Sequence, residues 1–208
     1  MSKKVSGNPT GRPRAFSEEQ ALDAAMHVFA SKGYESASLT DLTAAMGINR
    51  VSMYATFGNK EALFVKAMTR YTDVGARRFA QCLAISSARQ AIEQLLYDSV
   101  TMFTDAEGLG VCFVTQGPLT NVEASEETKQ FVAQKRVEIE LALRHRLDQA
   151  VEEGELAIDV STIDLARFYA VMIQGIALQA QHGGTQEELL RVVDVAMEKW
   201  PQPSNSNH

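Results

Sequence analysis

The sequence has few of the features that would place it outside the cell, in a membrane or among disulfide-stabilised scaffolds. Its two cysteines, Cys82 and Cys112, cannot build a disulfide framework and fit a reducing compartment. No apolar run follows the first cations, so no secretory signal is readable. The longest charge-free window, residues 168–186, is interrupted by Gln and His side chains, which argues against a membrane span. We therefore expect a cytoplasmic protein without membrane contact.

Signatures of catalysis and metal binding are also missing. We find no phosphate-cradling glycine loop and no nucleophile elbow, and "GLG" at 108–110 lacks the spacing of either. His27, His145 and His182 are scattered without ligand spacing, and Arg144 and Arg146 flank His145 unfavourably for a cation. We expect no metal, no cofactor and no enzyme, with an all-α enzyme kept as the competing class.

Charge is present but unevenly spread. The formal net charge is −6, yet residues 1–70 hold 9 Lys/Arg against 6 Asp/Glu, and residues 71–208 hold 11 against 20. The first 16 residues carry Lys3, Lys4, Arg12 and Arg14 and no acid. This pattern predicts an anion-seeking N-terminus joined to a body with a different role.

Helical patterns fill most of the chain, and no convincing period-2 alternation or internal repeat interrupts them. Cap residues mark three short helices and the start of a long fourth one. Ser38 opens a capping box with Asp41, and Asn49 and Asn59 cap the third and fourth helices. Gly33 and Gly47 supply left-handed ends for the first and second helices. Later helices are expected over residues 88–103, 126–152, 162–181 and 186–200.

The fold class is therefore predicted as all-α. We expect a flexible basic arm at residues 1–15, a three-helix helix-turn-helix domain at 16–66, a larger helical-bundle domain for ligand binding and dimerisation at 67–200, and a disordered tail at 201–208.

The stretch "GINRVSMYATFGNKEALF", residues 47–64, carries the most specific chemistry. Ile48, Met53 and Phe57 have the spacing of core anchors for its short helix, which leaves the intervening side chains exposed. In a helix-turn-helix, such a second helix lies in the major groove of DNA. A helical hairpin that never touches nucleic acid has the same spacing and stays an alternative.

The exposed residue types suit DNA. Arg50 can fork onto guanine, Val51 can contact a thymine methyl and Ser52 can bond several bases. Tyr54, Thr56 and Lys60 suit phosphate oxygens, and the arm can add backbone or minor-groove contacts. The candidate DNA-binding residues are Arg12, Arg14, Ser38, Thr40, Asn49, Arg50, Val51, Ser52, Tyr54, Thr56 and Lys60.

Residues 12–66 resemble the N-terminal domain of the TetR family of bacterial transcriptional repressors. The shared features are "KGY" closing the first helix, "SLTDL" opening the second, "GI" at the turn, "YATF" in the third and "KEAL" opening the fourth. The resemblance implies DNA roles for Thr40, Arg50, Val51, Ser52 and Tyr54 and a phosphate role for Lys60. One departure is Ala55-Thr56, where the family often has an aromatic or His pair; Thr56 can still donate to phosphate.

The rest of the chain is expected to dimerise and hold an inducer. The apolar circumference of residues 163–178 requires burial on more than one side, by the chain itself and by a symmetric partner; a central helix in a monomer is the alternative. The candidate interface residues are Ile176, Leu189, Val193, Met197 and Trp200. The candidate ligand residues are Met102, Phe103, Cys112, Phe113, Gln116, Phe168, Met172 and Gln174. Each of these ligand candidates can also be an ordinary core residue.

The expected function is that of a homodimeric repressor that binds a palindromic double-stranded operator and is released by a small-molecule inducer. Two alternatives remain: a repressor that senses oxidants or electrophiles through Cys112, and a helical dimer that does not bind DNA.

Overall fold

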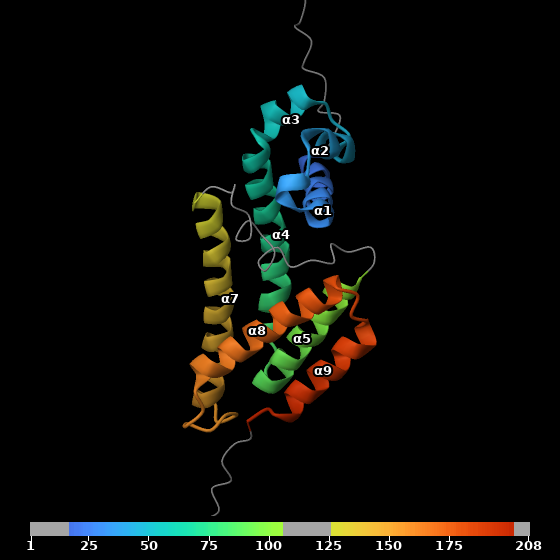
Figure 1. The fold of residues 1–208 in the computed structure, drawn as a ribbon. Helices are drawn as coiled ribbons and strands as arrows, with labels where there is room; N and C mark the ends of the chain where they lie inside the picture. The colour runs from blue at the N-terminus through green and yellow to red at the C-terminus, as the bar shows by residue number, and fades with distance from the viewer. Residues whose placement is uncertain (1–16, 106–125, 202–208) are drawn as a thin grey trace, which may run out of the picture.

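The computed structural model describes residues 17–105 and 126–201, and within these ranges the chain forms eight helices and no strand. In chain order they are α1 (Glu18–Ser36), α2 (Leu39–Met46), α3 (Arg50–Phe57), α4 (Lys60–Leu83), α5 (Ala88–Thr104), α7 (Glu126–Glu152), α8 (Thr162–Gln181) and α9 (Gln186–Glu198) (Figure 1). None of these helices is both long and apolar enough to cross a bilayer. The all-α prediction is confirmed for the described residues.

Local caps decide where the short helices begin and end. The Ser38 hydroxyl accepts from the Asp41 amide, and the Asp41 carboxylate accepts from the Ser38 amide, so the capping box at the start of α2 is complete. Gly47 ends α2 with φ 65°, a conformation that costs little without a Cβ. Asn49 then caps α3 by accepting from the Ser52 amide at 2.8 Å.

The first helix departs from its expected end. Gly33 has the predicted positive φ, 78°, but its ψ of 163° makes a kink, and helical structure continues to Ser36. The amide of Ala37 donates to the Gly33 carbonyl at 3.2 Å, which closes this extra turn. At the other end of the chain, α9 stops at Glu198, two residues before the predicted Trp200.

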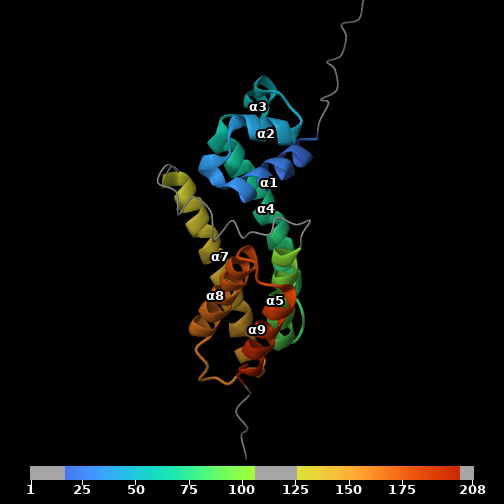
Figure 2. The ribbon, with the colours of Figure 1, turned by 45° about the vertical axis from the view of Figure 1, so that its right-hand side comes forward.

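The other helices gather mainly around the two ends of α4 (Figure 2). Each of these two groups has its own apolar core. Leu63, Phe64 and Met68, near the start of α4, are buried with α1, α2 and α3. Cys82, near its end, is buried in the larger core, where α5 packs against both α8 and α9. Val132 of α7 belongs to the first core with no exposed surface, although α7 packs mainly against α8.

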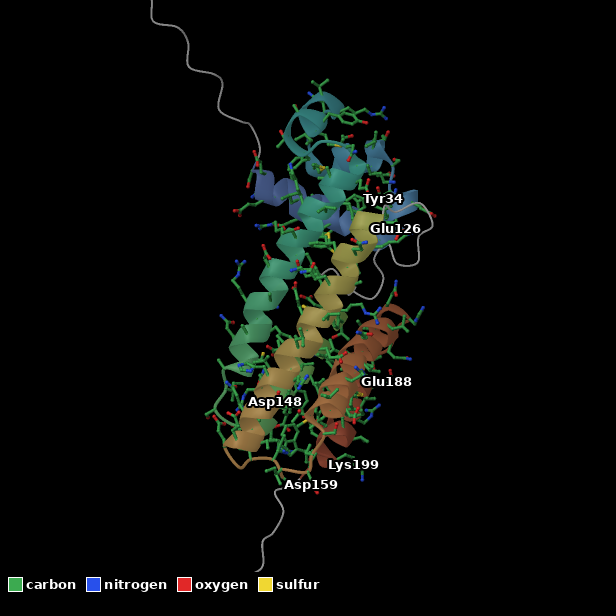
Figure 3. All side chains as sticks on the ribbon, turned by 90° about the vertical axis from the view of Figure 1, so that its left-hand side faces the viewer. Tyr34, Glu126, Asp148, Asp159, Glu188 and Lys199 are labelled. Carbon is green, nitrogen blue, oxygen red and sulfur yellow. The ribbon has the colours of Figure 1, made fainter. Side chains whose placement is uncertain are left out.

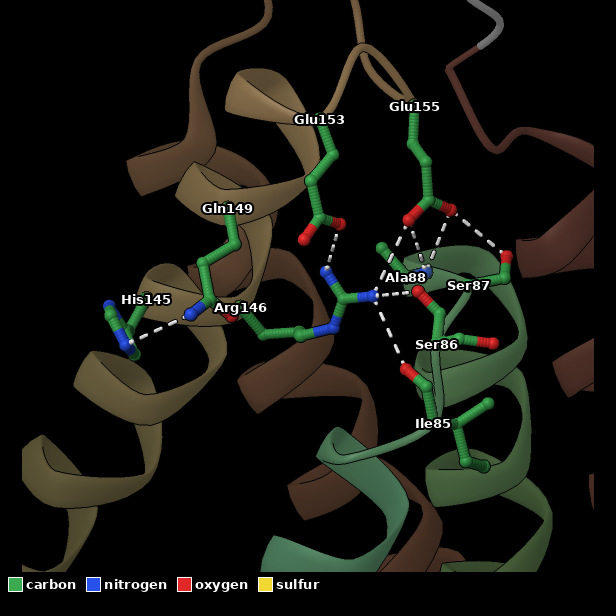
Figure 4. A network of polar contacts seen from close by, with 9 residues as sticks. All are labelled: Ile85, Ser86, Ser87, Ala88, His145, Arg146, Gln149, Glu153 and Glu155. Carbon is green, nitrogen blue, oxygen red and sulfur yellow. Dashed lines mark hydrogen bonds and ion pairs between the residues drawn. The ribbon is translucent and has the colours of Figure 1, made fainter.

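A buried cation joins α7 to the turn between α4 and α5 (Figure 4). The Arg146 side chain is 7% exposed, and its Nη2 donates to the carbonyls of Ile85 and Ser86 at 3.3 and 2.7 Å. Glu155 lies 3.4 Å from the same nitrogen and also accepts from the backbone amide of Ala88, at the start of α5, at 2.8 Å. Glu153, which is more exposed, lies 3.7 Å from Nη1 of the same arginine. Glu155 therefore pairs with the arginine and also caps a helix.

We expect Glu155→Ala to lower the free energy of unfolding by about 2–4 kcal/mol, because it leaves a buried cation poorly compensated and removes the α5 cap. Urea titration measures the change. Glu152→Ala, which removes an exposed carboxylate three residues earlier, is the matched control and should stay within about 0.5 kcal/mol of wild type. Equal stability of the two variants would contradict this role.

A second carboxylate ties α1 to α2. The Lys32 ammonium lies 2.6 Å from Asp41, and hydrogen bonds from Lys32 and from Ser38 lower the pKa of Asp41 to about 2 from an ordinary 3.8. Because the folded-state pKa is the lower one, the ionised form stabilises the fold above about pH 4. This contribution is lost as the pH falls from about 4 toward 2.

Asp41→Asn should accordingly lower the melting temperature at pH 7, and the difference from wild type should shrink as the pH falls through this window. Melting curves followed by circular dichroism at pH values from 7 to about 2.5 test this. Asp73→Asn, on an exposed part of α4, serves as the control. A difference that stays constant with pH would exclude the carboxylate charge as the cause.

Candidate DNA interface and ligand cavity

The recognition surface expected from the sequence lies on α3, at one end of the elongated molecule (Figure 1). Met53 is fully buried and Phe57 is 2% exposed, and these two side chains fix the helix to the N-terminal core. Val51 is 78% exposed and Tyr54 48% exposed. Helix α3 therefore presents one face to its own core and the opposite face to solvent.

Arg50 and Thr40 lie together on this surface. The Arg50 Nη2 donates to the Thr40 hydroxyl at 2.9 Å, across ten residues of sequence. Both side chains are exposed. The sequence placed these residues on two different helices of one interface, and the structure brings their side chains into contact.

The remaining candidates have structural partners. Ser38 and Asn49 are the N-caps of α2 and α3, and Ser52 is half-buried beside them. Lys60 donates to the Glu35 carbonyl at 3.0 Å and lies 4.7 Å from the centre of the Tyr34 ring.

Thr56 is half-buried, and its carbonyl accepts from Lys66 at 3.0 Å. Arg12 and Arg14 lie outside the described residues.

A cavity of about 980 Å³ opens between α4, α5 and α7, with Ile173 of α8 at its wall. Met102 and Phe103, two of the predicted ligand residues, line it. Cys112, Phe113 and Gln116 lie outside the described residues.

Three other predicted ligand residues do not line this cavity. Phe168 is 43% exposed, while Met172 and Gln174 are half-buried on α8. The helical pattern of α8 is apolar on nearly every side, so sequence alone did not show which side faces the cavity.

The sequence interpretation missed most of the cavity wall. Cys82 and Asp98 line it, and the Cys82 thiol donates to an Asp98 carboxylate oxygen at 3.4 Å. Burial, and after it the bond to Asp98, raises the pKa of Cys82 to about 11. The thiol therefore stays protonated at neutral pH and is a poor nucleophile. His145 on α7 also lines the cavity, and no sequence spacing indicated it.

The predicted dimer contacts require a correction. Ile176, Leu189, Val193, Met197 and Trp200 are each at most 5% exposed, because they pack in the core of the single chain. The large apolar side chains that α8 and α9 expose are instead Ile163, Phe168, Val171, Leu178, Val192 and Val195. A helix with apolar residues all round does not reveal from its sequence which stripe its own core takes.

Among the described residues, no group of three or more His, Cys, Asp or Glu side chains is placed to hold a metal ion.

Comparisons with known proteins agree with this architecture. Residues 21–67 match the family model described as bacterial regulatory proteins, tetR family. The chain is 30% identical over 194 residues to the HTH-type transcriptional repressor ComR of Escherichia coli K12, with 92% of each chain covered. It is 28% identical to the uncharacterised HTH-type regulator YezE of Bacillus subtilis, over 90% of this chain and 97% of that protein.

Solved structures extend the likeness over both parts of the chain. The TetR family transcriptional regulator CifR, in a cysteine-substituted form complexed with 26-bp double-strand operator DNA, is 39% identical. The match covers 91% of this chain and all of that one, with a TM-score of 0.86. Together with the exposed face of α3 and the helical body behind it, these similarities show that the chain belongs to the TetR family of bacterial regulatory proteins.

Proposed function

We propose that this protein is a homodimeric, DNA-binding transcriptional repressor whose affinity for its operator falls when a small molecule occupies the cavity between α4, α5 and α7. The observation that carries the proposal is the two-sided character of α3, whose buried Met53 and Phe57 leave Val51 and Tyr54 exposed. The likeness to CifR, whose structure contains operator DNA, and to the repressor ComR supports the same conclusion. We place this activity in the cytoplasm, where operator DNA is found.

In this proposal α3 enters the major groove. Arg50 reads a guanine, Val51 contacts a thymine methyl and Ser52 bonds a base edge. Phosphate contacts come from the residues at the helix starts and from the far end of α3. These are Ser38, Asn49, Tyr54, Thr56 and Lys60, with Arg12 and Arg14 of the arm. Thr40, whose hydroxyl accepts from Arg50, lies beside the base contacts. Lys60 must share or release its Glu35 carbonyl to serve a phosphate.

The exposed apolar stripe of α8 and α9 is our candidate for the dimer contact. Phe168, Val171 and Leu178 follow one another at helical spacing along α8, and Val192 and Val195 do so along α9. A twofold axis through these helices would present two copies of α3 to two half-sites of a palindromic operator.

Release by a ligand follows from the course of α4. Its first turns are buried with the recognition helix, and side chains of its second half, among them Tyr71, Phe79 and Cys82, line the cavity. A ligand that fits only one arrangement of α4 shifts the population toward that arrangement. A difference of a few kcal/mol between the two states is enough to clear the operator.

The competing functions have less support. No relative described above is named as an enzyme, and the described cavity wall holds no cluster suited to a metal. The redox alternative rested on Cys112, which lies outside the described residues, and the protonated Cys82 does not replace it.

The DNA-binding proposal is tested with a duplex selected by the wild-type protein from a random library. Arg50→Ala should weaken binding to that duplex about 10- to 100-fold, because one bidentate base contact is lost, and Tyr54→Ala should weaken it as well. Arg77→Ala removes the same charge from an exposed position of α4 and should leave the affinity close to wild type. Gel-shift titration at fixed salt gives the dissociation constants. Unchanged binding by both interface variants would refute the contact assignment.

The dimer proposal is tested by charge. The double substitution Val171→Asp and Val195→Asp places carboxylates at two positions that are each 59% exposed in the single chain, so the protomer should fold normally. In a dimer those charges would be buried, at a cost of several kcal/mol each, and we expect a monomer in size-exclusion chromatography with light scattering. Val137→Asp, on α7 at 57% exposure, should remain dimeric. A wild-type protein that is monomeric at micromolar concentration would overturn the proposal.

A further inference from the structure

We propose that Thr40 is a positioning residue for Arg50: its hydroxyl holds the guanidinium in the direction from which it reads a guanine. Specificity at that base pair would then depend on a residue of α2 as well as on the recognition helix. This inference rests on the proposed DNA-binding function and adds the origin of the arginine's orientation.

The geometry starts from the place of Arg50 in its helix. Arg50 is the first residue of α3, and side chains on a helix lean toward its N-terminus. The Arg50 side chain is thereby directed back over the turn at residues 47–49 toward the start of α2. There its Nη2 donates to the Thr40 Oγ1 at 2.9 Å.

Thr40 is a stiff support for this bond. Its β-branched side chain has few rotamers in a helix, and it is the second residue of α2. The start of α2 is fixed by the Ser38–Asp41 capping box and by the bridge of 2.6 Å from Lys32 of α1. The next residue but one, Leu42, is fully buried in the N-terminal core. The position of the hydroxyl is therefore set by the rigid part of the domain.

The bond leaves Arg50 able to read a base. A guanidinium carries five N–H donors, one of which bonds Thr40, whereas a bidentate contact to guanine O6 and N7 needs two. Within residues 17–105 and 126–201 no carboxylate forms an ion pair with Arg50, whereas Arg70 is held by Asp23 at 2.7 Å. The partner of Arg50 is a neutral hydroxyl, so its full charge remains for DNA.

Preorganisation is the physical benefit. An unrestrained arginine has many rotamers, and fixing one of them on binding reduces the affinity. The same freedom lets the side chain bind a phosphate in place of a base. The bond to Thr40 restricts those rotamers in the free protein. Less conformational entropy is then lost when α3 enters the groove, and the remaining donors point in one direction.

A double-mutant cycle tests this role on the duplex selected by wild-type protein. Thr40→Val removes the hydroxyl at nearly constant shape and should weaken binding about 3- to 10-fold, the cost of fixing one flexible arginine side chain on binding. Thr40→Ser keeps a hydroxyl and should recover most of the affinity. Thr69→Val, at an exposed threonine of α4, is the matched control. Circular dichroism confirms that each variant is folded.

Coupling to Arg50 is the decisive readout. In an Arg50→Ala background, Thr40→Val should change the affinity less than twofold, a non-additivity that marks interacting residues. Each guanine of the duplex is then replaced in turn by 7-deazaguanine, which lacks the N7 acceptor. The guanine that Arg50 reads is the one whose replacement weakens binding by the wild type but not by Arg50→Ala. At that guanine, the replacement should weaken binding by Thr40→Val less than it weakens binding by the wild type.

Three results would overturn the inference. They are an unchanged affinity of Thr40→Val, a loss of equal size in the Arg50→Ala background, and an unchanged preference for guanine. The second would mean that Thr40 acts alone, through its own phosphate contact, while the proposed DNA-binding function still stood. A wild-type protein that selects no duplex would overturn that function itself and this inference with it.

Discussion

The recognition helix exists because its inner face is buried. A helix of eight residues is not stable alone in water, since nucleation costs more than two turns of hydrogen bonds return. Burial of Met53 and Phe57 against the core of α1, α2 and α4 supplies the missing free energy. The same burial fixes the rotation of the helix about its axis, and this rotation decides which side chains face outward. The stability of α3 and the outward placement of its proposed DNA contacts are two consequences of one contact.

Features governed by neighbours in sequence were predicted well. The Ser38 capping box, the Asn49 cap and the left-handed Gly47 depend on residues within one turn of each other. The outward placement of Val51 and Tyr54 followed from helical spacing around Met53 and Phe57. The kink at Gly33 was not foreseen, because a glycine of positive φ commonly ends a helix, whereas here helical structure resumes and continues to Ser36.

Features governed by distant packing were predicted poorly. Helix α8 is apolar on most sides, so its sequence could not show that Ile176 faces its own core while Val171 faces outward. The cavity wall joins α4, α5 and α7, three helices whose mutual distance no local pattern encodes. Cys82 and Asp98 meet there from different helices.

The burial of Val132 links the two halves of the molecule in a way that a division into separate domains does not convey. Helix α7 runs alongside α4 (Figure 3). Its Val132 lies in the N-terminal core with no exposed surface. Removing α7 would expose to water the apolar surface of the N-terminal core that Val132 covers, and the loss of this burial weakens the core. A fragment that ends within α4 is therefore not a self-sufficient unit. The two ends of the molecule should melt as one cooperative body.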